Sequence, residues 1–205
     1  MGLFVKICGL ANAADAMAVA GLRPDALGFV LWPGSKRCAR AEDVRDWVRD
    51  VPAGLLKVGV FVDATPDEVQ RAVETAGLDV AQLHGAERPE EFAGRPFRLW
   101  RSLSLAGREN AVPTGWRVDA FLVDTYSPHS PGGTGQVGDW AAARSFVQRS
   151  PCPVLLAGGL GPANVKAAVA AVGPWGVDVS SGVEAQPGRK DLAKVREFIE
   201  QCREE

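Results

Sequence analysis

The chain has 205 residues, 46% of them hydrophobic, and a formal net charge of −2 at pH 7. This length suits one domain with a full core, and the charge lacks the basic surplus that marks a nucleic-acid partner. No apolar stretch approaches the roughly 20 residues that a bilayer requires, and the opening Met1–Lys6 is too short for a signal peptide. We therefore expect one domain over residues 1–205, no nucleic-acid or membrane partner, and a cytoplasmic location.

Short β-rich runs alternate with stretches of helical period, which is typical of βα units. Strands are expected at Phe4–Cys8, Ala26–Leu31, Lys57–Val62, Val80–Leu83, Phe97–Ser102, Ala120–Asp124, Val154–Ala157 and Val177–Ser180. Helices are expected at Asp15–Ala20, Ala41–Asp50, Thr65–Ala76, Asp139–Gln148, Gly161–Ala171 and Asp191–Cys202. The connection after strand five, with Gly107, Pro113 and Gly115, leaves room for little more than a turn. The alternation predicts an α/β fold, a single-domain (β/α)8 TIM barrel.

The longest irregular stretch is Ser127–Gly138, which is rich in proline and glycine. Loops of that length in compact domains usually serve as lids or binding loops. We therefore expect this stretch to border the functional site.

Four cysteines lie far apart, without a Cys-x-x-Cys motif and with only two histidines in the chain. This spacing is not that of a metal site. A reduced protein without metal is expected, with paired disulfides as the open alternative. We assign no site role to Cys38, Cys152 and Cys202, because none lies at a predicted strand end facing the mouth of the barrel.

Two predicted strands end in small residues that expose the backbone. The seventh ends in Gly158 and Gly159, and the eighth runs into Ser181 and Gly182. Free N–H groups at such strand ends suit an anion, and the loops after strands seven and eight frequently bind phosphate in βα barrels. We therefore expect a phosphate site here.

Other strand ends deliver Cys8, Arg37, His84, Arg101 and Asp124 to the same mouth. Each has a simpler interpretation. Cys8 would be an inert buried thiol and Arg37 a solvated loop charge, while His84 would be a hydrogen-bonded wall residue and Asp124 a cap of the next segment. Their convergence on one rim, next to a phosphate site, instead favours a base, an acid and an anion clamp.

Lys6 lies two residues before Cys8, so both side chains point to the same face of their strand. A nearby ammonium favours the thiolate, and we expect it to lower the pKa of Cys8 toward neutrality. The alternative for Lys6 is an ion pair with Asp124 or Asp178 inside the barrel, and both roles are compatible.

A series of motifs in this order resembles the phosphoribosylanthranilate isomerase family of tryptophan biosynthesis from end to end. The motifs are Lys6-Ile-Cys8-Gly9-Leu, Ala26-Leu-Gly-Phe-Val, Ser35-Lys-Arg37, Val58-Gly-Val-Phe-Val62, Gln82-Leu-His-Gly85, Gly132-Gly-Thr-Gly135 with Asp139-Trp140, Ala157-Gly-Gly-Leu160, Asn164-Val165, Gly176-Val-Asp-Val-Ser-Ser-Gly-Val-Glu184 and Pro187-Gly-x-Lys-Asp191. The sequence departs from the family pattern at Cys38, at Trp100-Arg101 and at Gln136-Val-Gly138, positions that concern the lid and the wall around the aromatic half of the substrate.

The resemblance implies an Amadori rearrangement of N-(5′-phosphoribosyl)anthranilate without a cofactor or metal, by a monomer or homodimer. It implies Asp124 as the general acid and Cys8 as the general base. Arg37, His84 and Asp178 would contact the substrate, with Arg37 on the anthranilate carboxylate. Gly158, Gly159, Ser181 and Gly182 would bind the phosphate. Gly132, Gly133 and Gly135 would belong to a lid that closes over the ligand.

Two other classes stay open on the sequence alone. Another phosphate-barrel enzyme, such as an aldolase or decarboxylase, would normally need a Schiff-base lysine or a set of metal-binding carboxylates at a strand end; Lys57 begins its strand and Lys6 is set deep. A non-catalytic phosphosugar-binding barrel would keep the glycine-rich strand ends but would need neither Cys8 nor Asp124.

Overall fold

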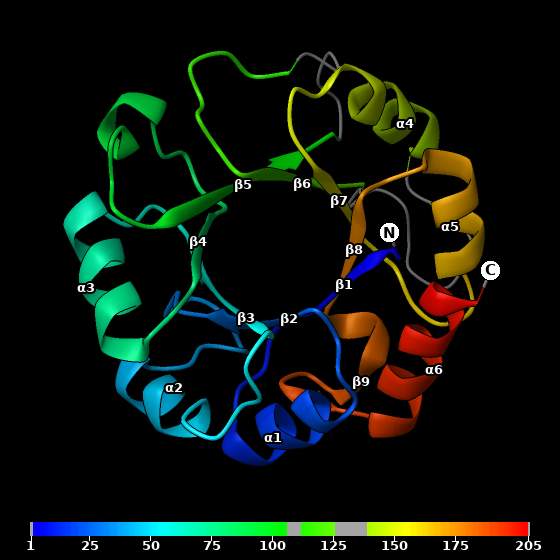
Figure 1. Cartoon of the computed structure of the whole chain (residues 1–205), viewed down its shortest axis with the longest axis horizontal. Helices are drawn as coiled ribbons and strands as arrows, with labels where there is room; N and C mark the ends of the chain where they lie inside the picture. The colour runs from blue at the N-terminus through cyan, green and yellow to red at the C-terminus, as the bar shows by residue number, and fades with distance from the viewer. Residues whose placement is uncertain (1, 106–111, 126–138, 205) are drawn as a thin grey trace.

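Eight parallel strands close into a barrel in chain order, with β8 returning to β1 (Figure 1). The structure is a computed structural model that describes residues 2–105, 112–125 and 139–204. The barrel strands are β1 (Phe4–Ile7), β2 (Ala26–Val30), β3 (Leu56–Phe61), β4 (Val80–Leu83), β5 (Arg98–Ser104), β6 (Ala120–Asp124), β7 (Val154–Ala157) and β8 (Gly176–Val179). All eight expected strands are confirmed, and the (β/α)8 fold with them.

Helices surround the barrel on its outside (Figure 1). They are α1 (Ala13–Gly21), α2 (Ala41–Trp47), α3 (Pro66–Ala76), α4 (Trp140–Arg149), α5 (Val165–Val172) and α6 (Leu192–Arg203). Each of the six expected helices is present. Between β4 and β5 the chain forms only a 3₁₀ helix at Pro89–Phe92, and the described residues between β5 and β6 contain no helix.

Local signals in the sequence explain where the helices begin and end. Thr65 and Glu68 form a reciprocal capping box at the start of α3, and Pro66 occupies its first turn, where no N–H partner is needed. Gly77 ends the same helix in the left-handed conformation, at φ 63°. Asp139 and Asp191 cap α4 and α6 through their carboxylates.

The connection from β8 to α6 contains structure that the sequence did not indicate. A 3₁₀ helix at Ser181–Val183 leads into a short antiparallel hairpin of β9 (Glu184–Gln186) and β10 (Arg189–Lys190). Figure 1 shows β9 at the lower edge of the barrel, between α1 and α6.

Aromatic side chains close the amino-terminal end of the barrel. Phe4 stacks on Trp175 with ring centroids 4.3 Å apart, and Trp100 meets both rings edge-on. Trp100 is 1% exposed and packs with the interior residues Ala26, Val58 and Val80. Trp100, one of the departures from the family pattern, therefore fills the amino-terminal end of the barrel. The carboxyl-terminal end is left for a functional site.

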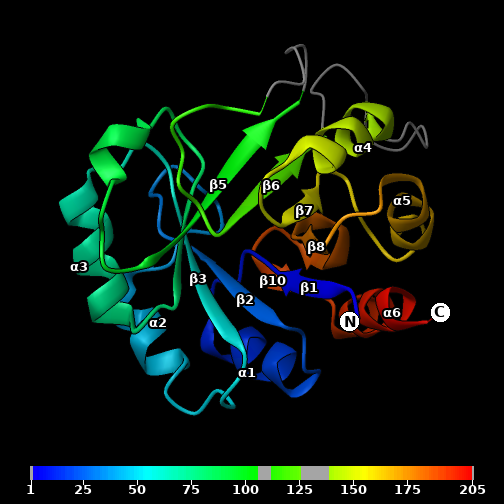
Figure 2. The same ribbon diagram turned by 45° about the horizontal axis from the view of Figure 1, so that its top comes forward.

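Helix α6, near the carboxyl end of the described chain, lies beside β1 on one side of the barrel (Figure 2). Arg203 near the end of α6 donates a hydrogen bond of 2.6 Å to the backbone carbonyl of Arg23, so α6 is joined to the segment after α1. None of the helices in the described ranges has both the length and the apolar character needed to cross a membrane.

Candidate active site

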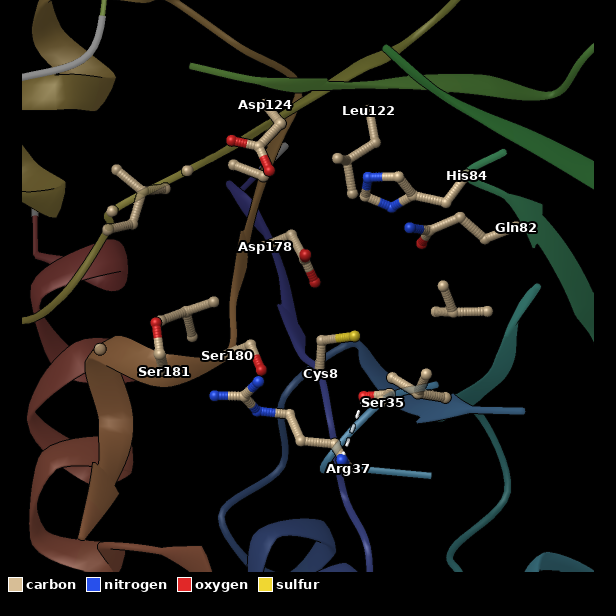
Figure 3. Close-up of a pocket in the computed structure, with 18 of the residues that line it drawn as sticks. Cys8, Ser35, Arg37, Gln82, His84, Leu122, Asp124, Asp178, Ser180 and Ser181 are labelled. Carbon is tan, nitrogen blue, oxygen red and sulfur yellow. Dashed lines mark hydrogen bonds between the residues drawn. The ribbon is translucent and has the colours of Figure 1, made fainter. Parts of the chain in front are cut away.

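The carboxyl ends of the strands line a cavity of about 640 Å³. Nine of the site residues expected from the sequence border it, namely Cys8, Arg37, His84, Asp124, Gly158, Gly159, Asp178, Ser181 and Gly182. Figure 3 shows Cys8 and Asp178 between Arg37 on one side and Asp124 on the other. The predicted lid residues Gly132, Gly133 and Gly135, and the departure at Gln136–Gly138, lie outside the described residues.

Cys8 follows the last residue of β1 and is 7% exposed. The absence of a side chain at Gly28 on the neighbouring β2 makes room for it, because a Cβ there would lie 2.8 Å from Cys8 Sγ and 3.0 Å from Lys6 Nζ. The thiol and the Lys6 ammonium therefore lie close together around Gly28.

Burial raises the pKa of the Cys8 thiol above its ordinary value, although the charge of Lys6 acts in the opposite direction. The expectation that Lys6 brings this pKa toward neutrality is therefore wrong in its net direction. The cause is physical: a thiolate at this depth loses more hydration than the ammonium returns, and Asp178 opposes its negative charge.

Lys6 is fully buried and donates from Nζ to Asp178 Oδ1 at 2.7 Å. The two residues are directly opposite in the β1–β8 pairing. Burial alone would lower the pKa of Lys6, but Asp178 and Cys8 together raise it, so the ammonium stays charged. Of the two ion pairs considered for Lys6, the one with Asp178 forms.

Replacing Lys6 with Met should lower the free energy of unfolding by about 3–5 kcal/mol, the usual effect of leaving one member of a buried ion pair behind. The Asp178 side chain is only 11% exposed and has little water to replace its partner. Urea unfolding followed by circular dichroism measures the change. The same substitution at Lys57, whose pair with Asp79 is partly exposed, serves as the control and should cost about 1 kcal/mol or less. Equal losses in the two variants would contradict the prediction.

Arg37, in the loop after β2, lies against Glu184 of the β8–α6 connection. Its Nε and Nη2 donate to the two carboxylate oxygens of Glu184 at 2.8 and 2.7 Å. These hydrogen bonds raise the pKa of Arg37 further above its already high value. The guanidinium is thus held in one plane at the cavity wall, next to Ser180 (Figure 3).

The glycine-rich turns after β7 and β8 contact each other. A Cβ at Gly182 would lie 1.9 Å from the carbonyl oxygen of Leu160, so only glycine allows this approach. Gly158 and Gly159 adopt positive φ angles of 92° and 66°. Asn164 fixes their turn by accepting from the Gly161 N–H and donating to the Gly159 carbonyl, both at 2.9 Å.

Neither turn leads directly into an α-helix, although a helix is expected from Gly161 onward. Helix α5 begins only at Val165, and β8 is followed by a single turn of 3₁₀ helix. Within the described residues the N–H of Gly159 donates to no protein acceptor, so it is available to an anion. The anion-binding potential of this side therefore comes from turn backbone.

Arg101, considered from the sequence as a mouth residue, does not border the cavity. Its guanidinium donates to Glu87 Oε2 and to the Gly85 carbonyl, both at 2.6 Å, and lies over the ring of Trp116. Glu87 also accepts from the backbone N–H groups of Asp63 and Gly85. Arg101 thus secures the loop after β4 instead of facing a ligand.

All four cysteines are free, and Cys38 is exposed whereas Cys202 is buried.

The positions of the lysines bear on the alternative of a Schiff-base aldolase. No lysine borders the cavity among the described residues, and the amine of Lys6 is fully buried against Asp178. A Schiff-base aldolase therefore has no amine at this site in that part of the chain.

Glu184 and Lys190 belong to the family motifs, but the sequence alone indicates no role for them. Glu184 lies 147 positions from Arg37. No local sequence pattern indicates that Arg37 pairs with Glu184. The two residues become neighbours only because the barrel closes.

Comparison with known proteins gives consistent matches along nearly the whole chain. A family model described as N-(5'phosphoribosyl)anthranilate (PRA) isomerase matches residues 5–201. A relative named N-(5'-phosphoribosyl)anthranilate isomerase from Desulforudis audaxviator is 44% identical over 203 residues, covering 98% of each chain. The solved phosphoribosyl anthranilate isomerase from Thermus thermophilus matches at a TM-score of 0.85 and 37% identity, covering 97% of this chain and 98% of that one. A further solved structure, of such an isomerase in complex with reduced 1-(o-carboxyphenylamino)-1-deoxyribulose 5-phosphate, matches at a TM-score of 0.81 and 32% identity, covering 98% of both chains.

Proposed function

This chain belongs to the N-(5'-phosphoribosyl)anthranilate isomerase family, and we infer that it converts N-(5'-phosphoribosyl)anthranilate to 1-(2-carboxyphenylamino)-1-deoxyribulose 5-phosphate in tryptophan biosynthesis. The observation that carries this inference is the match over residues 5–201 combined with a cavity that Cys8, Asp124 and Arg37 border together. The reaction is an intramolecular aldose–ketose isomerisation. It moves protons within one molecule and needs an acid and a base.

Asp124 acts in this proposal as the acid. It ends β6 at the mouth and points into the cavity (Figure 3). Its proton passes to the ribose ring oxygen while the bond from that oxygen to C1′ breaks, which opens the ring to a Schiff base.

Cys8, which borders the same cavity, acts as the base. Its thiolate removes the proton from C2′, and the electron pair of that bond moves toward the Schiff-base nitrogen. The resulting enolamine then becomes the ketone as C1′ gains a proton and the C2′ hydroxyl loses one. A raised thiol pKa leaves fewer thiolates at neutral pH, but each one is a stronger base.

The two charged ends of the substrate bind donors on different loops of the barrel. Arg37 holds the anthranilate carboxylate, for which a planar guanidinium is well suited. The phosphate binds the turns of Gly158, Gly159, Ser181 and Gly182. His84 and Asp178, which also border the cavity, contact the remaining groups of the substrate.

An assay with purified protein tests this function directly. Substrate is formed in solution from anthranilate and a phosphoribosyl donor, and the loss of anthranilate-ring fluorescence is followed after adding the protein without metal or nucleotide. Loss of fluorescence at an enzymatic rate is expected. A signal that decays no faster than in the absence of protein would contradict the function.

Gly182→Ala should raise KM by at least about 10-fold with a much smaller effect on kcat, because the added Cβ displaces the Leu160 carbonyl and opens the phosphate turn. Inorganic phosphate should inhibit the wild-type enzyme competitively and the variant more weakly. Gly21→Ala is the control, since a Cβ there meets nothing within 4 Å. An unchanged KM in Gly182→Ala would remove this turn from the phosphate site.

We also propose a domain organisation, a cellular location and an oligomeric state. Residues 1–205 are proposed to act as one catalytic domain. Four free cysteines are in keeping with a cytoplasmic location, where disulfides are rare. The described site residues come from one chain, which a monomer and a homodimer both allow; sedimentation equilibrium distinguishes them.

A further inference from the structure

We propose that Glu184 and Lys190 form a buried bridge between the two anion-binding sides of the cavity and act as positioning residues for a substrate with a carboxylate at one end and a phosphate at the other. This inference rests on the proposed function, in which Arg37 binds the substrate carboxylate. Neither residue needs to touch the substrate, because each acts through a neighbour.

Glu184 fixes the orientation of Arg37. The carboxylate takes the Nε–H and one Nη2–H of the guanidinium, at 2.8 and 2.7 Å. A guanidinium has five N–H donors, so three remain, including a pair on the edge formed by Nη1 and Nη2. That edge has the geometry to receive a second carboxylate in bidentate fashion. The side chain of Glu184 is only 4% exposed, whereas that of Arg37 is 25% exposed and accessible to a ligand.

Lys190 connects Glu184 to the phosphate side. Its Nζ donates to Glu184 Oε1 and to the carbonyl oxygen of Ser180, both at 3.1 Å. Ser180 directly precedes Ser181 and Gly182 of the phosphate turn. One ammonium thus contacts the carboxylate that orients Arg37 and the backbone where the phosphate turn begins.

The hairpin that carries both residues is anchored to the surrounding helices. The N–H of Lys190 donates to Asp15 of α1 at 2.8 Å. Lys194 of α6 donates to the Glu184 carbonyl at 3.2 Å, and the Gly188 N–H donates to Glu184 Oε1 at 3.3 Å. These contacts restrict the motion that would otherwise allow Glu184 to swing away from Arg37.

The charges of the three residues add to one net positive charge. Glu184 alone would cancel the charge of Arg37 and weaken its attraction for a carboxylate. Lys190, whose side chain is fully buried, restores the positive charge behind the pair. Burial would raise the pKa of Glu184, but Arg37 and Lys190 hold it below the usual value, so the carboxylate stays ionised.

The test uses two probes that each carry one of the anions, anthranilate and inorganic phosphate, as inhibitors of the full-length enzyme. Glu184→Gln should raise the inhibition constant of anthranilate roughly 10-fold, as expected for hydrogen bonds between charged groups, and leave that of phosphate within about two-fold. Lys190→Met should raise both constants. In both variants KM should rise by a larger factor than kcat falls, because the reacting groups Cys8 and Asp124 are unchanged.

Matched substitutions on the surface provide the controls. Lys166→Met removes an exposed lysine paired with Glu204, and Glu91→Gln removes the exposed partner of Arg88. Neither should change an inhibition constant. Circular dichroism and thermal melting report folding, and if Lys190→Met does not fold, the double variant Glu184→Gln/Lys190→Met, which removes both buried charges, takes its place with the same expected rise in both constants.

Inhibition constants within two-fold of wild type in Lys190→Met, or in the double variant that replaces it, would overturn the bridge. So would a rise for anthranilate alone, because it would leave the phosphate side unconnected. Arg37→Met separates this outcome from failure of the proposed function: if anthranilate binds that variant as tightly as wild type, the role of Arg37 itself is wrong. If anthranilate binding weakens in Arg37→Met but not in the bridge variants, only the bridge is wrong.

Discussion

Replacement of Cys8 by Ala should lower kcat by roughly 10²- to 10⁴-fold, the range for removal of a positioned acid or base, with little change in KM. Cys8 is 7% exposed and borders the cavity between Arg37 and Asp124 (Figure 3). Its loss removes the base without removing a group that binds the carboxylate or the phosphate.

Steady-state kinetics from the fluorescence decrease, with kcat and KM resolved separately, measures this effect. Cys152→Ala makes the same chemical change at a half-buried thiol outside the cavity and should leave both parameters unchanged. Near-normal turnover in Cys8→Ala would show that another group takes the C2′ proton. His84, which borders the same cavity, would then be the next residue to test.

The barrel and the convergence of its site residues follow from patterns that lie along the chain. Apolar runs such as Val154–Ala157 predict buried parallel strands, and the alternation with helices predicts their closure. Once the strands are ordered, the topology alone places Cys8 and Asp124 at one mouth, although they are far apart in sequence. Their roles come from the family resemblance and remain proposals.

The features that the sequence did not predict depend on distances across the fold. Glu184 and Lys190 lie in a hairpin around Pro187 and Gly188 too short to show any period. Strand alternation placed Lys6 beside Cys8 correctly, but a pattern of residues does not reveal how completely a thiol loses its water. The net rise in the pKa of Cys8 depends on that burial. Arg101 was expected at the mouth for its position in β5, yet Glu87 and Gly85 hold it elsewhere.

Asp124→Asn should lower kcat by a similar factor, roughly 10²- to 10⁴-fold, and should also change the shape of the pH dependence. The active form needs Cys8 without its proton and Asp124 with one. Burial raises the pKa of the Cys8 thiol above its ordinary value. The productive pair is one form of the singly protonated state, and its fraction is constant between the two pKa values of the pair.

The wild-type kcat should accordingly show a broad plateau that falls at low pH and again above the pKa of Cys8. In Asp124→Asn only the thiolate has to form, so the residual rate should climb about tenfold per pH unit up to that raised pKa and then level off. The pH dependence of iodoacetamide labelling at Cys8 gives the same pKa independently. Asp50→Asn removes an exposed carboxylate and is the control for the kinetic effect of Asp124→Asn. A plateau and turnover like those of wild type in Asp124→Asn would mean that another group protonates the ring oxygen, because a carboxamide cannot supply that proton.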